Sequence, residues 1–303
     1  MIRLLTILTL TLFSFLVMGP LGAHTFSKEE AEQIGEIASE YLVKHPEFLI
    51  QASRNLQEKQ IKQQHDSYVK RIIGEEEKGK KAENKTLKEL LHNPDTPYVG
   101  PKDAKVVVIE FFDYQCSYCS KVAPAVEQLI KDNPDIKVIF KDYPIFGSEW
   151  STSDYAANVS TLAFDQGGSD LYHKYHNAIF ATGKDEGKLT IEDVNKVAKD
   201  LKIRLGKHAK PDKFKGKVEL IDSVHKNMSL GNDLGIMGTP FLVVLPAENI
   251  DRSNLTVFSG YPANPRAGVK AAVEALQQAV DKAATAYKKK NEDDHDKKHD
   301  SEK

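Results

Sequence analysis

The chain has 303 residues, 40% of them hydrophobic, and a formal net charge of −2 at pH 7. Such mild acidity argues against nucleic acid as the main partner, because binding to phosphates requires a basic surface. A chain of this length can bury a large core without disulfide bonds, yet it contains two cysteines, Cys116 and Cys119. We therefore expect the two thiols to have a chemical role.

The first 23 residues have the three parts of a secretory signal peptide. Arg3 supplies a positive charge, residues 4–17 are apolar, and Ala23 is the small residue that signal peptidase requires. The apolar run is shorter than the roughly 20 residues of a membrane-spanning helix, and no other stretch is long and apolar enough. The sequence predicts cleavage near Ala23 and a soluble, exported product.

A polar, helix-rich segment follows over residues 24–91. Ser27 and Glu30 have the spacing of a capping box, and apolar residues then recur at the helical period. Pro46 interrupts this pattern and suits the first turn of a second helix, which extends to about Ile73. Neither helix is apolar enough to be a stable domain. We expect their apolar stripe to pack on the rest of the chain or on a second copy.

A charged, glycine-containing stretch over residues 74–86 is typical of a linker. It ends at Thr86, whose spacing to Glu89 is again that of a capping box and predicts a short helix.

The next part of the chain has the pattern of an α/β domain. Residues 106–112 are almost continuously apolar and β-branched or aromatic, as in a strand that is buried on both faces. The two cysteines come directly after this strand, and a helical stretch and a second strand over residues 136–140 follow them. Strand, helix and strand of these lengths predict a βαβ unit.

The remainder predicts one α/β domain with a helical insertion. Residues 147–231 have only helical patterning, strand signals return at residues 240–245 and 255–258, and a last helix covers residues 266–287. The domain therefore extends over residues 92–287. Residues 288–303 are charged and nearly free of apolar side chains, so we expect a disordered tail.

The two cysteines form a Cys-x-x-Cys motif at the start of a helix, within reach of a disulfide bond. Cys116 lies at the helix N-terminus, where free backbone N–H groups and the helix dipole favour a thiolate, so it is the expected nucleophile. Cys119 lies one turn further inside and suits the resolution of a mixed disulfide. We predict a reversible disulfide between the two residues.

Three other roles compete for the cysteines. A structural disulfide that closes so small a loop would add little stability. A zinc site needs about four ligands, and His173 and His176 could complete one. These histidines are interleaved with apolar and aromatic residues, however, which favours ordinary packing. Two unrelated buried thiols would not explain the strand-to-helix context. The sequence favours redox chemistry, and we expect no metal and no cofactor.

Two further features fit a redox site. Glu110 is the one charged residue in the apolar strand; if it is buried beneath the helix, its pKa would be raised and it could relay a proton to or from Cys119. The alternative is a glutamate at the sheet edge. Thr239 and Pro240 come just before an apolar strand. A cis bond there would leave the backbone of Thr239 free to pair with an extended peptide.

These residues resemble the DsbA family of thioredoxin-fold proteins. Residues 107–119 are similar to the family's strand and redox motif, and residues 235–244 are similar to its cis-proline loop. The resemblance covers about residues 93–287. It implies a thioredoxin-like α/β fold with a helical insertion. By position, it implies catalytic roles for Cys116, Cys119 and Glu110, and substrate binding by Thr239, Pro240, Ser117 and Tyr118.

The sequence departs from the strongly oxidising DsbA of enterobacteria. Ser117 and Tyr118 stand where that protein has proline and histidine, and the threonine before the proline is more like the isomerase DsbC. Residues 24–91 resemble the dimerisation region of longer DsbA-like proteins, which include the Com1-like surface antigens. The resemblance implies a homodimer with isomerase as well as oxidase capacity.

The sequence therefore predicts a thiol-disulfide oxidoreductase of the periplasm or cell surface. Its expected partners are unfolded or misoxidised exported proteins and a membrane redox protein of the DsbB or DsbD kind, with no nucleic acid. The alternative is a dimeric periplasmic chaperone or surface interaction protein with little redox turnover.

Overall fold

The computed structural model describes residues 26–74, 84–205 and 218–301. The expected signal peptide and most of the expected linker lie outside the described residues. The chain divides into two compact units, residues 1–60 and 61–303, and α2 crosses the boundary between them. No helix in the described ranges is long and apolar enough to cross a membrane.

The first unit contains α1 (Lys28–Lys44) and the start of α2 (Pro46–Ile73). The capping box is confirmed: the Ser27 hydroxyl accepts a hydrogen bond from the Glu30 backbone, and the Glu30 carboxylate accepts one from the Ser27 backbone. The second helix begins at Pro46 as expected. None of the residues of α1 is buried, and its side chains Ile37 and Tyr41 are 69% and 51% exposed. The apolar stripe of this unit therefore lies open.

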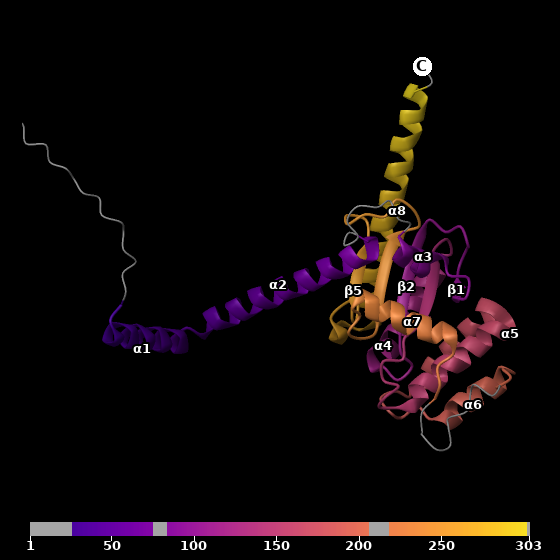
Figure 1. Ribbon diagram of the computed structural model, residues 1–303, viewed down its shortest axis with the longest axis horizontal. Helices are drawn as coiled ribbons and strands as arrows, with labels where there is room; N and C mark the ends of the chain where they lie inside the picture. Colours follow the sequence, from indigo (N-terminus) through magenta and orange to yellow (C-terminus); the bar gives the residue numbers. More distant parts are fainter. Residues whose placement is uncertain (1–25, 75–83, 206–217, 302–303) are drawn as a thin grey trace, which may run out of the picture. The chain divides into compact units, whose positions relative to one another are not determined.

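The second unit is built on a five-stranded sheet (Figure 1). The strand order is β1-β3-β2-β4-β5, with β2 parallel to β3 and the other pairs antiparallel. Helix α4 joins β2 to β3, so the predicted βαβ unit is confirmed, and β4 and β5 form a hairpin. The elements are β1 (Tyr98–Val99), β2 (Val106–Phe112), α4 (Ser117–Asp132), β3 (Lys137–Asp142), β4 (Phe241–Pro246) and β5 (Thr256–Ser259).

Helices cover both faces of the sheet. Side chains of β2 alternate between the two faces: Val108 packs in one apolar cluster and Ile109 in the other. The first cluster holds residues of α4, α5 (Ser151–Ala181) and α8 (Gly268–Ser301). The second holds residues of the last turns of α2, α3 (Lys85–His92) and α7 (Asp222–Leu234). Every residue of β2 is buried, which explains its continuous apolar run.

The helical insertion is smaller than the helical block in the sequence. Helices α5 and α6 (Ile191–Asp200) pack on each other, whereas α7 packs against the sheet through Leu230 and Leu234. Helix α3 begins one residue before Thr86, because Asn84 is its N-cap and accepts a hydrogen bond from the backbone of Leu87.

The C-terminal helix differs from the expectation. A short 3-10 helix, η2 (Pro265–Ala267), precedes α8, and α8 continues to Ser301 where we expected a disordered tail from residue 288. The composition of the tail excludes burial in a core. It does not exclude a helix, because lysine and glutamate are good helix formers and opposite charges four residues apart stabilise a helical turn.

Candidate active site

Cys116 is the N-cap residue of α4, and Cys119 lies in the first turn of the helix. Both are free thiols; Cys116 is 4% exposed and Cys119 is completely buried. The Cys116 thiol donates a hydrogen bond of 3.2 Å to the backbone carbonyl of Thr239, and the peptide between Thr239 and Pro240 is cis. Two segments that lie more than one hundred residues apart in the sequence therefore meet at the thiol.

The pKa values of the two thiols are shifted in opposite directions. A hydrogen bond from the Cys119 thiol and the backbone N–H groups of Tyr118 and Cys119 lower the pKa of Cys116 to about 7, although burial opposes them. Burial raises the pKa of Cys119 well above its usual value, and its hydrogen bond to Cys116 adds to this shift. Near neutral pH, Cys116 is therefore a nucleophilic thiolate in a large fraction of the molecules, and Cys119 keeps its proton.

Glu110 lies on the central strand, between Phe140 of β3 and Leu242 of β4, so it is not at the sheet edge. Its neighbours on the same face of β2, Val108 and Phe112, belong to the cluster that α4 covers. Glu110 is 1% exposed, and neither of its carboxyl oxygens has a hydrogen-bond partner among the described residues. Burial raises its pKa to about 8, so the carboxyl group is mostly protonated at pH 7.

Asp113, which the sequence patterns did not single out, holds the turn between β2 and α4. One carboxylate oxygen accepts a hydrogen bond of 2.8 Å from the backbone of Gln115, and the other accepts bonds from the Phe146 backbone and the Ser153 hydroxyl. Aspartate commonly bonds the backbone two residues further along in a turn, so the position of Asp113 offered a local signal. No comparable signal pointed to Gln115, which is fully buried beside Cys116.

The surface around Cys116 carries exposed side chains from two segments. Tyr118 is 46% exposed, and the Nζ atom of Lys121 lies 4.9 Å from the centre of its ring. Met237, two residues before Thr239, is 84% exposed. Ser117 is half-buried between the cysteines. Tyr118 and Met237 are therefore exposed side chains of the two segments that meet at Cys116.

The two candidate zinc ligands on α5 have other neighbours. His176 is buried among aromatic rings, 4.7 Å from the ring centre of Phe112, and burial lowers its pKa to about 3. His173 pairs with Glu127 of α4. Within the described parts of the chain, no three histidine, cysteine, aspartate or glutamate side chains cluster as a metal site would require.

A sheet with a βαβ unit, a Cys-x-x-Cys motif at the start of its helix, and a cis-proline segment against the first cysteine define the thioredoxin class of proteins. The profile of the thioredoxin family matches residues 92–254. The chain therefore belongs to the thioredoxin family, in agreement with its resemblance to the thioredoxin-fold DsbA proteins. A second profile, described as the copper resistance protein ScsC N-terminal domain, matches residues 30–63.

Solved structures and a curated protein resemble the chain. BcfH of Salmonella enterica Typhimurium is 36% identical, with a TM-score of 0.63 over 84% of this chain and 96% of BcfH. A periplasmic thioredoxin-like protein from Salmonella enterica serovar Typhimurium is 20% identical and shares the fold, with a TM-score of 0.50 over 68% and 99% of the two chains. The Na(+)/H(+) antiporter NhaA 1 of Salinispora arenicola is 27% identical over 59% of this chain, which spans only 26% of the antiporter.

Proposed function

We propose that the protein is a periplasmic thiol-disulfide oxidoreductase that forms or isomerises disulfide bonds in exported proteins. One observation carries the proposal: two buried thiols one turn apart, with pKa values shifted in opposite directions, at the N-terminus of α4. This asymmetry suits disulfide exchange, which needs one nucleophilic thiolate and a second thiol held in reserve.

In the oxidising direction, a client thiolate attacks Cys116 of the Cys116–Cys119 disulfide. The bond between the two cysteines breaks, a mixed disulfide forms at Cys116, and Cys119 leaves with the electron pair. A second client thiolate then attacks the client sulfur of the mixed disulfide and releases Cys116. The client loses two electrons, the pair gains them, and a membrane redox protein of the DsbB or DsbD kind restores the site.

Glu110 is our proposed proton donor for Cys119. Its carboxyl group is mostly protonated at pH 7, and its charge, when ionised, adds to the raised pKa of Cys119. The proton passes to Cys119 when this thiolate leaves and returns to Glu110 when the disulfide re-forms. Proton transfer by a positioned group of this kind contributes roughly 100-fold or more to a rate.

Client peptides bind in extended form against Thr239, Pro240, Ser117 and Tyr118 in this proposal. The support is the position of the Thr239 carbonyl, 3.2 Å from the Cys116 sulfur, and the exposed ring of Tyr118. Backbone pairing recognises any unfolded chain, because it uses groups that all peptides have. The protein should therefore accept a broad range of unfolded or misoxidised client proteins.

Refolding of ribonuclease tests the proposed reaction. The oxidised full chain should reactivate reduced ribonuclease, and the reduced chain should repair scrambled ribonuclease in a glutathione buffer. Cys116→Ser should remove both activities. The alternative function, a chaperone or surface interaction protein, predicts instead that Cys116→Ser protects an aggregating client as well as the unchanged chain does, and that neither protein reactivates ribonuclease.

We propose that a second copy of the chain covers the open apolar face of the first unit, so that the protein is a homodimer. Ile34, Ile37 and Tyr41 recur on one face of α1 and are all about half exposed or more. Removal of residues 1–91 would be a poor test, because it also deletes core residues of the second unit. These are Tyr68, Val69 and Ile72 of α2 and Leu90 and Leu91 of α3.

Point variants of α1 test the dimer cleanly. Ile37→Glu places a charge within the apolar stripe and should halve the mass measured by light scattering. Ser39→Glu adds the same charge to an exposed position on another face of α1 and should leave the mass of the dimer unchanged. A monomeric unchanged chain contradicts the proposal.

Export to the periplasm is supported by the signal-peptide pattern and by the periplasmic thioredoxin-like protein that shares the fold. The full chain, expressed in a Gram-negative host, should appear in the periplasmic fraction with His24 as its first residue. An uncleaved N-terminus or a cytosolic product contradicts this part of the proposal.

A further inference from the structure

Gln115 precedes the expected nucleophile, and all of its polar groups are engaged. The residue is completely buried. Its backbone N–H donates to Asp113, and its three remaining groups bond to the α5–α6 loop, which comprises residues 182–190. The Gln115 carbonyl accepts a bond of 2.8 Å from the Glu186 backbone, its Oε1 accepts 3.0 Å from the Gly187 backbone, and its Nε2 donates 3.0 Å to the Leu189 carbonyl.

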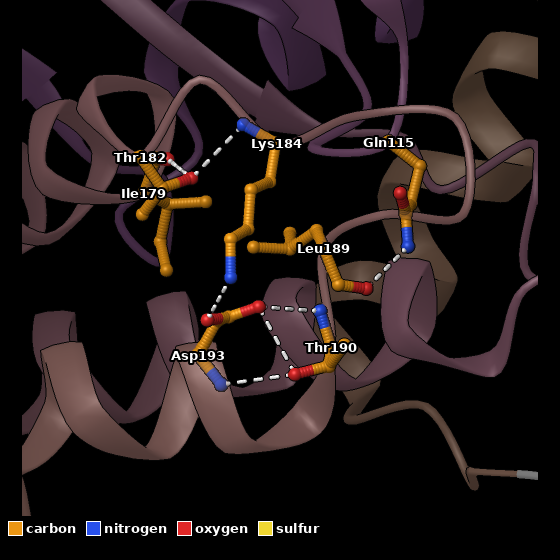
Figure 2. A network of polar contacts seen from close by, with 7 residues as sticks. All are labelled: Gln115, Ile179, Thr182, Lys184, Leu189, Thr190 and Asp193. Carbon is orange, nitrogen blue, oxygen red and sulfur yellow. Dashed lines mark hydrogen bonds and ion pairs between the residues drawn. The ribbon is translucent and has the colours of Figure 1, made fainter.

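The α5–α6 loop is itself held in one conformation. Figure 2 shows the side chain of Gln115 directed at the Leu189 carbonyl and the far side of the loop fastened to the start of α6. There, Thr190 and Asp193 form a capping box, and the ammonium group of Lys184 bonds the Asp193 carboxylate at 2.6 Å. The loop therefore offers Gln115 fixed partners.

Gly187 makes the close approach of the loop possible. Its φ is +81°, a conformation that residues with a side chain rarely adopt. A Cβ atom at this position would lie 2.8 Å from the Nε1 atom of Trp150. A side chain at residue 187 would therefore push this part of the loop away from its place against Gln115.

These bonds fix the peptide plane that leads into the nucleophile. The carbonyl of Gln115 and the N–H of Cys116 belong to one planar peptide unit. The carbonyl is held by Glu186 from the insertion, and the N–H donates 3.0 Å to the carbonyl of Asp113. With both ends held, the plane cannot rotate freely. Its orientation sets the φ of Cys116, and hence where the thiol points relative to the N–H groups of Tyr118 and Cys119.

We propose that Gln115 is a positioning residue for Cys116, through which the α5–α6 loop of the helical insertion sets the reactivity of the thiolate. The inference rests on the proposed function only in taking Cys116 as the nucleophile. When the bonds to the loop are lost, the plane rotates, and the thiolate loses the donors that stabilise it. The reduced pair is then less stable relative to the disulfide, so the protein becomes a weaker oxidant.

Gln115→Met tests the proposal, because methionine keeps the length of the side chain but cannot make the two side-chain bonds to Gly187 and Leu189. Without these bonds the loop is no longer held where the Glu186 backbone reaches the carbonyl of residue 115. Gln166 supplies a matched control within the same insertion. Its amide bonds the backbone of Arg204 in the same two-point manner, with Nε2 3.0 Å from the Arg204 carbonyl and Oε1 2.9 Å from the Arg204 backbone nitrogen. Gln166→Met breaks an equivalent pair of bonds away from the turn that carries Cys116.

The readouts are the thiolate absorbance at 240 nm against pH and the rate of alkylation by iodoacetamide, both on the full reduced chain. We expect Gln115→Met to raise the pKa of Cys116 and to slow alkylation at pH 7 about fivefold, because less thiolate is present. The reduction potential against glutathione should become more negative. Gln166→Met should leave all three at the values of the unchanged chain.

Gly187→Ala approaches the same contact from the loop and leaves residues 113–119 unaltered. It should shift the thiolate titration in the same direction as Gln115→Met. If Gln115→Met does not fold, the result with Gly187→Ala decides whether the proposal stands. The proposal is overturned if both folded variants keep the alkylation rate of the unchanged chain and lose only thermal stability. If the unchanged chain has an acidic Cys116 but no ribonuclease activity, the proposed function fails and the positioning role stands.

Discussion

The two units of the chain use their apolar residues in opposite ways. In the second unit, β2 is buried along its whole length and apolar clusters fill both sides of the sheet. In the first unit, α1 has no buried residue, and Ile37 is 69% exposed. Helix α2 has apolar side chains of both kinds: Ile50 is exposed in the first unit, and Ile72 is completely buried in the second.

This difference separates what one copy of the chain can do alone from what needs a partner surface. The cysteines, Glu110 and Thr239 all belong to the second unit, whose core is closed. The chemistry of the site therefore depends on contacts within one chain. The first unit exposes an apolar face that water disfavours, so its stability depends on what covers it. Mutations in the two units should consequently change different properties.

The largest expected effect lies at the cysteines. Cys116→Ser should lower the rate of disulfide exchange by about 1000-fold or more, because the nucleophile is gone. Cys119→Ser should accumulate a mixed disulfide with a client, visible on a non-reducing gel, because no thiol remains to resolve it. Both variants should keep the oligomeric mass of the unchanged chain. A change in mass would show that the site and the first unit are coupled.

Glu110 gives the next largest effect, on stability and its dependence on pH. The pKa of this acid is raised to about 8 in the folded state, so folding favours the protonated form. Stability is therefore highest at pH values below the unfolded pKa of about 4.5 and is lost as pH rises toward 8. Glu110→Gln removes this loss and should stabilise the protein at pH 8, by an amount on the order of 4 kcal/mol, and very little at pH 4.

Thermal unfolding of the reduced protein at several pH values measures this effect. Glu149→Gln, at an exposed position in the same unit, is the control. It should change the melting temperature only slightly, and by the same amount at every pH. An equal response of the two variants at pH 8 would contradict the assignment. Glu110→Gln should also slow the resolution of the mixed disulfide, because the amide cannot transfer a proton to Cys119.

Helix α2 allows the contrast between the units to be measured with one substitution at two positions. Ile72→Ala leaves a cavity in the second cluster and should cost about 2–4 kcal/mol of unfolding free energy in urea. Ile50→Ala, on the 53% exposed side chain, should cost less than about 0.5 kcal/mol in the second unit's transition. Equal losses would indicate that the second unit does not unfold independently of the first.

The two capping boxes give the smallest expected effects. Ser27→Ala and Thr190→Ala each remove one cap and should cost about 1 kcal/mol locally. Loss of the Ser27 cap should appear as reduced helix content by circular dichroism, with the second unit's melting temperature unchanged. Loss of the Thr190 cap should lower that melting temperature slightly, because α6 packs against α5. The reverse pattern would contradict the division into units.

Much of the fold could be predicted from short-range patterns. The strand at residues 106–112 matches β2 because a strand buried on both faces needs an unbroken apolar run, and Pro46 marks the start of α2 because proline suits the first helical turn. Strand β1 was missed, since its two residues are too few for any pattern. The helical pattern of residues 147–231 does not show that α7 packs against the sheet. A helix that packs on other helices and a helix that packs on a sheet both need one apolar face, so their sequence patterns are alike.

The sequence by itself determined the chemistry available to this protein: a Cys-x-x-Cys pair at a helix start, one acid in an apolar strand, and a proline before a later strand. These are local features, because helix ends and strand faces depend on neighbours within a few residues. Tertiary structure decided which distant groups surround the thiol. The Thr239 carbonyl meets Cys116 from 123 residues away, and the Gln115 amide finds Leu189 across 74 residues. Contacts of this kind arise from how the insertion and the sheet pack, so no local pattern encodes them.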